Sequence, residues 1–222
     1  TLKLRLDDAA AQAAYRFAPG QFNMLYLYGV GEVPISIMSD PEERDGIGHT
    51  IRAQGIVTHG LSALQPGDRL GLRGPFGHGW PLQEVSGCDV VLVTGGLGCA
   101  PVVSVIHYLM RRRERYGKLV IIQGVKHAED LIWREHYDRW AKLPDTQVLV
   151  AASEGAAFWP WHIGRVTELF GLANFDPECA VAMKAAGFPP AAWVDEMLAA
   201  GIDAFYQKQA GQAVAVYHPA LK

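Results

Sequence analysis

One short stretch of the chain constrains its fold more than any other. Residues 90–93 are four consecutive apolar residues that favour strands, and they run into a turn with three glycines at residues 95–98. Pro101 then opens a segment with helical periodicity, residues 102–116. A strand, a tight turn and a helix in this order gather backbone N–H groups at the positive end of a helix dipole. The stretch predicts an anion-binding turn. Because it lacks the GxGxxG spacing, an ordinary glycine-rich connection is the alternative.

The part of the chain before residue 84 reads as an all-β domain. Short apolar runs alternate there with turn signals such as Gln65-Pro66-Gly67-Asp68, which is typical of a small antiparallel β-barrel. No methionine precedes Thr1, which leaves open that an opening strand is missing. The strands that we expect are residues 1–6, 22–28, 49–57 and 69–73.

The part after residue 87 alternates between strand-like and helix-like segments, which indicates a parallel sheet covered by helices. The fold prediction is therefore a two-domain chain, with an antiparallel β-barrel over residues 1–84 and an α/β parallel-sheet domain over residues 85–222. The expected strands are residues 90–93, 119–123, 147–151 and 181–183. The expected helices are residues 102–116, 128–140, 166–170 and 191–200.

Composition excludes several classes of protein. The net charge of −3 provides no basic field for nucleic acid. Cys88, Cys99 and Cys179 lie far apart and form no CxxC pair, so we predict no metal site and no disulfide framework. Such isolated thiols fit a reducing cytoplasm. Glycines and polar residues interrupt the apolar run of residues 90–110, so we predict no transmembrane segment.

Three further motifs precede the glycine-rich turn in a fixed order. They are Gly-Glu-Val-Pro-Ile-Ser-Ile at residues 31–37, Gly-Ile-Val-Thr-His-Gly-Leu at 55–61 and Arg-Gly-Pro-Phe-Gly-His-Gly-Trp-Pro at 73–81. Together with the turn, this set resembles the ferredoxin–NADP reductase superfamily over about residues 1–183. Within it the chain looks most like the FAD- and NAD(P)-binding gamma subunits of cytoplasmic nickel–iron hydrogenases. It is also similar to dihydroorotate dehydrogenase electron-transfer subunits and to the corresponding subunit of anaerobic sulfite reductase.

The resemblance implies that the first domain binds FAD. The residues expected along the isoalloxazine ring are Pro34, Ile35, Ser36 and Ile37, with Ser36 near the flavin N5 atom. No side chain is expected to act as an acid or base, because the flavin carries the chemistry. A capping role is the alternative for the Ser36 hydroxyl.

The FAD diphosphate needs other partners here than in the wider superfamily. That superfamily has arginine and tyrosine at the positions of Val33 and Ile35, and both residues are apolar in this chain. The resemblance therefore shifts the diphosphate contact to backbone N–H groups around Val57 and Thr58 and to the Thr58 hydroxyl, which otherwise caps a turn. The remaining residues expected on the FAD side are Thr50, Arg52, His59 and Gly74, the last of which begins a rigid turn that ends the barrel.

In the second domain the resemblance implies a site for NAD(H) or NADP(H). Gly124 and Lys126 follow a strand at the edge where ligands gather in open α/β sheets. Lys126 is expected at the adenosine ribose or a 2′-phosphate, and a solvated loop lysine is the alternative. The residues expected around the diphosphate are Gly95, Gly96, Leu97, Gly98 and Pro101.

The chain departs from its look-alikes at two places. They carry a Cys-Gly-Pro turn near the nicotinamide, whereas this chain has Met-Lys-Ala-Ala-Gly-Phe-Pro at residues 183–189. They also end in a cysteine quartet that holds a [2Fe–2S] cluster, and residues 205–222 contain no cysteine. We expect no metal ligands of this kind in residues 205–222, so the chain is either a member of the group without the cluster or one with a truncated or misassigned tail.

These observations predict an NAD(P)H-dependent flavin oxidoreductase. The expected protein transfers a hydride between NAD(P)H and FAD and passes single electrons to an iron–sulfur subunit, in a complex with hydrogenase-type catalytic subunits. Two alternatives stay open. One is a stand-alone NAD(P)H–flavin reductase, and the other is a dinucleotide-sensing module without redox chemistry.

Overall fold

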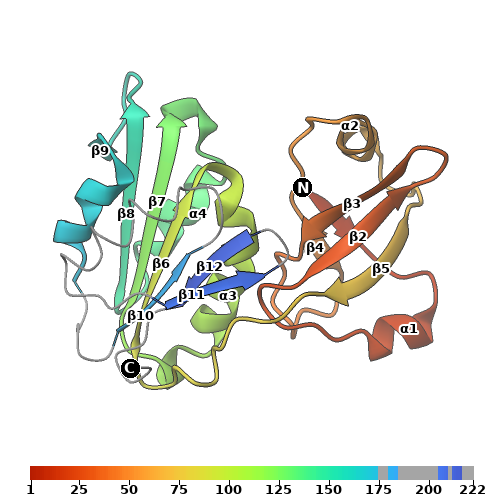
Figure 1. The fold of residues 1–222 in the computed structure, drawn as a ribbon, viewed down its shortest axis with the longest axis horizontal. Coiled ribbons are helices and arrows are strands. Elements are labelled where there is room, and N and C mark those ends of the chain that lie inside the picture. Colours follow the sequence, from red (N-terminus) through yellow and green to blue (C-terminus); the bar gives the residue numbers. More distant parts are fainter. Residues whose placement is uncertain (175–179, 185–204, 210–211, 217–222) are drawn as a thin grey trace. The chain divides into compact units, whose positions relative to one another are not determined.

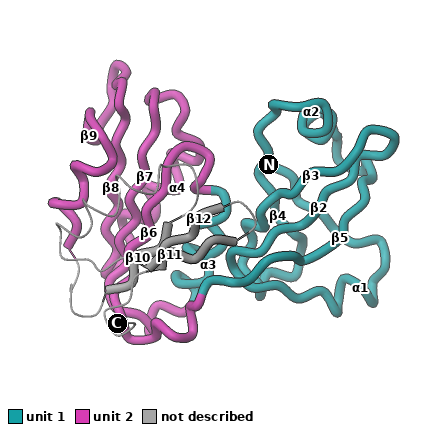
Figure 2. Tube along the Cα trace, viewed as in Figure 1, with its two compact units in different colours: residues 1–80, 100–111 teal, residues 81–99, 112–222 magenta. Residues whose placement is uncertain are grey.

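The computed structural model describes residues 1–174, 180–184, 205–209 and 212–216. The chain divides into two compact units (Figure 2). The first comprises Thr1–Trp80 and Ala100–Arg111, and the second comprises Pro81–Cys99 and Arg112–Lys222. The division thus falls after Trp80, and the helix after the glycine-rich turn groups with the first unit.

Two antiparallel sheets form the first unit, in the barrel-like arrangement that the sequence predicts (Figure 1). A single bridge between Ile37 and His49 connects the ends of the two sheets. The three-stranded sheet has the order β3 (Gly31–Ser36), β2 (Phe22–Leu27) and β5 (Gly71–Phe76). The two-stranded sheet pairs β1 (Leu2–Leu4) with β4 (Ile47–His49).

Two helices of this unit were not expected, α1 (Ala9–Ala14) and α2 (Ile56–Ala63). The predicted strand over residues 49–57 is wrong, because β4 ends at His49 and residue 56 already begins α2. Gly55 is the N-cap of α2, and the Thr58 hydroxyl accepts a hydrogen bond from the Gly55 N–H over 2.9 Å. This local capping overrides the strand propensity of Ile56 and Val57.

The expected turn at Gly74 is also wrong. Gly74 lies within β5, which continues to Phe76, and the register of β2 and β5 shifts between Phe22 and Met24. Gly74 has a φ of +145°. A residue without a side chain is needed there because a Cβ atom would collide with the side chain of Asn23.

The second unit contains the predicted parallel sheet, now seven strands wide (Figure 1). Its inner strands are buried on both faces, as expected for a parallel sheet. An antiparallel pair at one edge and a short strand at the other were not expected. The strand order is β11 (Phe205–Gln209), β12 (Gln212–Val216), β10 (Ala180–Lys184), β6 (Asp89–Gly95), β7 (Leu119–His127), β8 (Thr146–Glu154) and β9 (His162–Ile163).

Several helices are shorter than their periodicity suggests. The segment 102–116 gives α3 (Ala100–Arg111) and then a 3-10 turn, Arg113–Arg115. The segment 128–140 is split, because Trp133 adopts a left-handed φ of 56° that separates a 3-10 turn from α4. The predicted helix at residues 191–200 lies outside the described residues. The remaining elements are the 3-10 turns η1 (Gly96–Cys99), η3 (Ala128–Asp130) and η4 (Val166–Leu172), and α4 (Arg134–Trp140).

Alternate side chains of the parallel strands supply one core of the second unit. Val91 and Val93 of β6 and Val120 and Ile122 of β7 pack against η4 through Leu169. Among the described residues, no helix is both long and apolar enough to cross a membrane. The core thus fixes the strand ends at which the candidate site begins.

Candidate functional site

The glycine-rich turn continues directly from β6. Gly95 ends the strand, Gly96–Cys99 form the turn η1, and α3 begins at Ala100, with Pro101 as its second residue. Residues 95–98 are half-buried. Gly96 has a φ of +51°, and an added Cβ atom would meet no atom of the described residues within 4 Å. The backbone therefore lies open where a diphosphate could approach it, and this open cradle fits a dinucleotide.

A buried glutamine holds this turn in place. The Gln123 side-chain nitrogen donates to the carbonyl oxygens of Gly96 over 3.1 Å and Gly124 over 3.0 Å. The Thr94 hydroxyl donates to the Gln123 side-chain oxygen. Both side chains are buried, and they face each other in the register of the sheet: Thr94 is the next-to-last residue of β6, and Gln123 lies midway along β7. Neither was predicted as a site residue, and the signal was a polar residue directly after a run of four apolar residues, 90–93 and 119–122.

Two predicted nucleotide contacts lie on β7 with different environments. A Cβ atom on Gly124 would come within 2.6 Å of the Val166 Cβ, so this glycine allows η4 to pack closely on the sheet. Lys126 lies two residues further on and is exposed. The structure thus supplies a packing reason for Gly124 and leaves the Lys126 ammonium accessible to a ligand.

The same sheet edge carries charged and aromatic side chains that were not predicted. His127 and Glu154 pair across β7 and β8, with the His127 Nδ1 atom 3.1 Å from a Glu154 carboxylate oxygen. The guanidinium of Arg134 lies 4.9 Å from the centre of the Trp161 ring and 5.9 Å from that of Trp159. These contacts add a cation held on aromatic faces to the second unit.

The thiol nearest the turn is chemically quiet. Cys99 ends η1 and is buried, and this burial raises the pKa of its thiol to about 12 despite a hydrogen bond with Tyr137. A thiol protonated at neutral pH is a poor nucleophile. Cys99 therefore contributes packing beneath the turn and no covalent chemistry.

The predicted flavin-lining residues are the last three residues of β3 and the residue after it, and they become more buried along the chain. Pro34 is exposed, Ile35 and Ser36 are half-buried, and Ile37 is fully buried in the core. The Ile37 side chain is therefore unavailable to a ligand. What this position can offer a flavin is its backbone, as can Ser36 together with its hydroxyl.

The first turn of α2 collects the predicted diphosphate contacts Val57 and Thr58. The Thr58 hydroxyl accepts from the Gln54 and Gly55 N–H groups over 3.0 and 2.9 Å and donates to the Gly55 carbonyl over 3.0 Å. The one hydroxyl proton of Thr58 is therefore already used within the fold. The N–H groups of the first helical turn have no carbonyl partner within the helix, so these backbone groups fit an anion better than the hydroxyl does.

Two more of the predicted FAD residues lie in the loop between β4 and α2, and a third, His59, lies in α2 with its Nδ1 atom 3.0 Å from the Gly55 carbonyl oxygen. The Thr50 hydroxyl donates to the Met38 sulfur over 3.0 Å and lies 2.9 Å from the Thr1 hydroxyl. Arg52 is exposed, two residues beyond. The structure therefore engages Thr50 within the fold and leaves Arg52 accessible near the start of α2.

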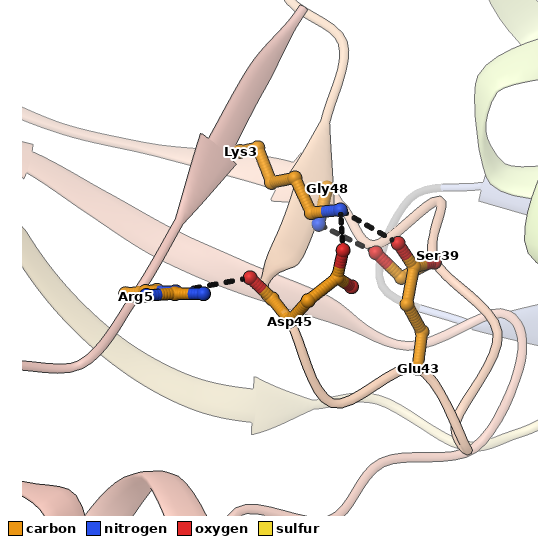
Figure 3. Close-up of polar contacts among 6 residues, drawn as sticks. All are labelled: Lys3, Arg5, Ser39, Glu43, Asp45 and Gly48. Carbon is orange, nitrogen blue, oxygen red and sulfur yellow. Dashed lines mark hydrogen bonds and ion pairs between the residues drawn. The ribbon is translucent and has the colours of Figure 1, made fainter. Parts of the chain in front are cut away.

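A salt-bridge cluster fastens the segment that leads into β4 (Figure 3). The Lys3 ammonium donates to Glu43 over 3.0 Å and to Asp45 over 2.6 Å, and Arg5 donates to the Asp45 carbonyl over 3.2 Å. The Ser39 hydroxyl accepts from the Gly48 N–H over 2.6 Å. Hydrogen bonding to the two carboxylates raises the pKa of Lys3. The cluster ties β1 to the loop before β4.

Three comparisons with known proteins agree with the two-unit fold and with a nucleotide site at the glycine-rich turn. Residues 92–182 match the family model described as an oxidoreductase NAD-binding domain. The chain is 35% identical over 78% of its length to the sulfhydrogenase 1 subunit gamma of Pyrococcus furiosus, of which it covers 60%. It is 29% identical over 70% of its length to a probable dihydroorotate dehydrogenase B electron transfer subunit of Methanocella arvoryzae, of which it covers 57%.

The fold has solved counterparts as well. A crystal structure of a ferredoxin NADP+ reductase from Neisseria gonorrhoeae with bound FAD and NADP superposes with a TM-score of 0.68 at 23% identity. The match covers 89% of this chain and 85% of that one. The chain spans about 60% of the length of the two curated relatives named above. The chain therefore has the ferredoxin–NADP reductase-like fold, and its residues 92–182 match an oxidoreductase NAD-binding domain.

Proposed function

We propose that the chain is a flavoprotein electron-transfer subunit, which exchanges a hydride between NAD(P)H and FAD and passes single electrons to an iron–sulfur partner subunit. The observation that carries this proposal is the turn at Gly96, whose backbone is open and whose carbonyl is pinned by Gln123. It lies within the segment that matches an oxidoreductase NAD-binding domain. The redox chemistry would belong to the bound cofactors, and the protein supplies position and electrostatics.

The residues divide between two binding tasks. On the nicotinamide side, we assign the diphosphate to the backbone of Gly95, Gly96, Leu97 and Gly98, and the adenosine end to the exposed Lys126. The positive end of a helix dipole and free N–H groups favour such an anion.

On the flavin side, the N–H groups of Val57 and Thr58 lie in the first turn of α2 and suit the FAD diphosphate. Arg52 is exposed nearby and can add a positive charge. We assign the ring edge to the backbone of Ile35 and Ile37 and to the Ser36 hydroxyl, with Pro34 beside it.

The proposed partners follow from the names of the curated relatives. One is the gamma subunit of a sulfhydrogenase and another is an electron transfer subunit of dihydroorotate dehydrogenase. We therefore propose hydrogenase-type catalytic subunits and an iron–sulfur subunit as partners. In this proposal the partner's iron–sulfur centre, held by cysteine thiolates, accepts the single electrons.

The visible spectrum of the purified chain tests the proposal. We expect flavin absorbance bands that bleach when NADH or NADPH is added. A colourless chain that cannot be reconstituted with FAD would contradict the proposal. If such a chain still bound a dinucleotide, it would be a sensing module instead. Full-rate dye reduction by the isolated chain would indicate a stand-alone reductase.

A further inference from the structure

A chain of buried polar side chains lies behind Ser36. The His49 Nδ1 atom is 2.9 Å from the Ser36 carbonyl oxygen, and the His49 Nε2 atom is 3.3 Å from the Asn23 side-chain nitrogen. Tyr15 completes the series, since its hydroxyl donates to the Asn23 side-chain oxygen over 2.7 Å. His49 and Asn23 are both fully buried. Four segments of the first unit thus meet in one hydrogen-bonded series.

The series fixes the position of every proton in it. Because the Asn23 oxygen accepts from Tyr15, the Asn23 amide nitrogen faces His49, and the His49 Nε2 atom must accept. The Nδ1 atom therefore carries the proton and donates to the Ser36 carbonyl. Burial lowers the pKa of His49 to about 4, which agrees with a neutral ring. His49 is thus a neutral donor aimed at the backbone of the end of β3, with the Ser36 carbonyl as its main acceptor.

The network needs a residue without a side chain beside Asn23. Gly74 lacks the Cβ atom that would collide with the Asn23 amide, and it holds a backbone φ of +145°. Buried polar groups stabilise a fold less than apolar packing does, but a fully satisfied network selects one geometry. The geometry selected here is that of Ser36, together with the Ile37–His49 bridge that follows it.

We propose that His49 is a positioning residue for the flavin-binding end of β3. Through its hydrogen bond to the Ser36 carbonyl it fixes the peptide that follows and the direction of the Ser36 hydroxyl. This inference rests on the proposed function, because it concerns the side of β3 that we assign to FAD. His49 touches no cofactor itself, and it acts through the backbone of residues 36 and 37.

Two amide substitutions separate the roles of the two ring nitrogens of His49. In H49N the amide nitrogen can occupy the place of Nδ1 and still donate to the Ser36 carbonyl. In H49Q the longer amide reaches the place of Nε2 and leaves that carbonyl without a donor. We expect the Kd for FAD to rise about tenfold in H49Q and less than threefold in H49N, since one hydrogen bond to a buried acceptor is lost in only the first. The flavin midpoint potential should shift in H49Q and stay near the wild-type value in H49N.

A third variant and a cofactor-free measurement guard against misfolding. Y15F removes only the hydroxyl that orients Asn23, so we expect a smaller rise in the Kd for FAD. Nitrogen-15 NMR of the cofactor-free chain should show His49 as the neutral Nδ1–H tautomer at pH 7, and a mixture of tautomers in Y15F. These signals report the network whether or not H49Q folds.

The outcomes distinguish the two proposals. Equal effects of H49N and H49Q on the flavin potential and on FAD affinity would reduce His49 to a packing residue and overturn the positioning role alone. An Nε2–H tautomer or a charged ring at pH 7 in the wild-type chain would do the same. A wild-type chain that binds no FAD would overturn the proposed function, and the positioning role would fall with it.

Discussion

The side-chain nitrogen of Gln123 donates a hydrogen bond to the carbonyl oxygen of Gly96 over 3.1 Å. Through this contact a residue in the middle of β7 holds the turn that follows the neighbouring strand β6. The Thr94 hydroxyl secures the opposite end of the same amide. The turn is therefore held by side-chain bonds as well as by its own backbone, and its open face is ready before a ligand arrives. Such preorganisation lowers the entropy cost of binding.

Replacing Gln123 with leucine should loosen the turn without removing any group that touches the ligand. We expect the Kd for the nicotinamide dinucleotide to rise about fivefold, the equivalent of one lost hydrogen bond of about 1 kcal/mol. FAD binding should be unchanged. Titration calorimetry measures both affinities. Q147L is the matched control, because Gln147 lies on the adjacent strand β8 near its amino end, away from the turn. Equal losses in Q123L and Q147L would contradict the clamp.

Substituting Gly96 with alanine tests the open face of the turn. The φ of +51° strains any residue with a Cβ atom by about 1 kcal/mol. The added methyl group would also project where the diphosphate is proposed to lie, so dinucleotide affinity should fall at least tenfold. G87A is a matched control, since Gly87 has a φ of +87° and also has no described atom within 4 Å of an added Cβ. Both variants should lose similar stability on urea unfolding. Only G96A should lose dinucleotide binding, and an unaffected G96A would remove the turn from the site.

We predict that the Thr58 hydroxyl stabilises the first turn of α2. T58A removes the contacts with Gln54 and Gly55 and should lower the free energy of unfolding by about 1 kcal/mol. The Kd for FAD should rise with it, because the N–H groups of the first turn fray. T58S keeps the hydroxyl and should restore both values. Urea unfolding and fluorescence titration of FAD measure them. If T58S matched T58A, the methyl group and not the hydroxyl would hold the turn.

Acidification should unfold the chain partly through His49. Its pKa is about 4 in the folded state, below the ordinary value of 6.5, so the unfolded chain binds more protons between these values. Stability therefore falls as pH drops from about 6.5 to 4, by about 3 kcal/mol from this one group. The measurement is the free energy of unfolding of the wild type and H49N at pH 7 and pH 4.5. H49N should lose less stability on acidification. Parallel pH profiles would show that His49 titrates normally.

Local patterns predicted the second unit better than the first. The apolar run at residues 90–93 and its glycines specify a strand and a turn within one window, and the structure has both. In residues 49–57 the strand propensity of Ile56 and Val57 competed with a capping contact of Thr58 that a propensity pattern does not reveal. Residues 56 and 57 are helical because the Thr58 hydroxyl forms its capping hydrogen bonds with residues at most four positions away.

The parts of the site that depend on long-range contacts escaped prediction. Gln123 lies within a segment that the sequence had linked to ligand binding, yet its bond to Gly96 spans 27 residues. The contact of His49 with Asn23 spans 26 residues and crosses between sheets. A pairing of this kind follows from the register of strands, and one sequence does not specify that register.

The shared space of Gly74 and Asn23 restricts how this protein can evolve. A mutation that gives position 74 a side chain would push on the amide that holds His49. A substitution of Asn23 alone would leave the His49 and Tyr15 side chains without their shared hydrogen-bond partner. A substitution at any one of these positions alone should destabilise the network. A different set of residues would therefore need two or more substitutions together. The four positions should be inherited as a block.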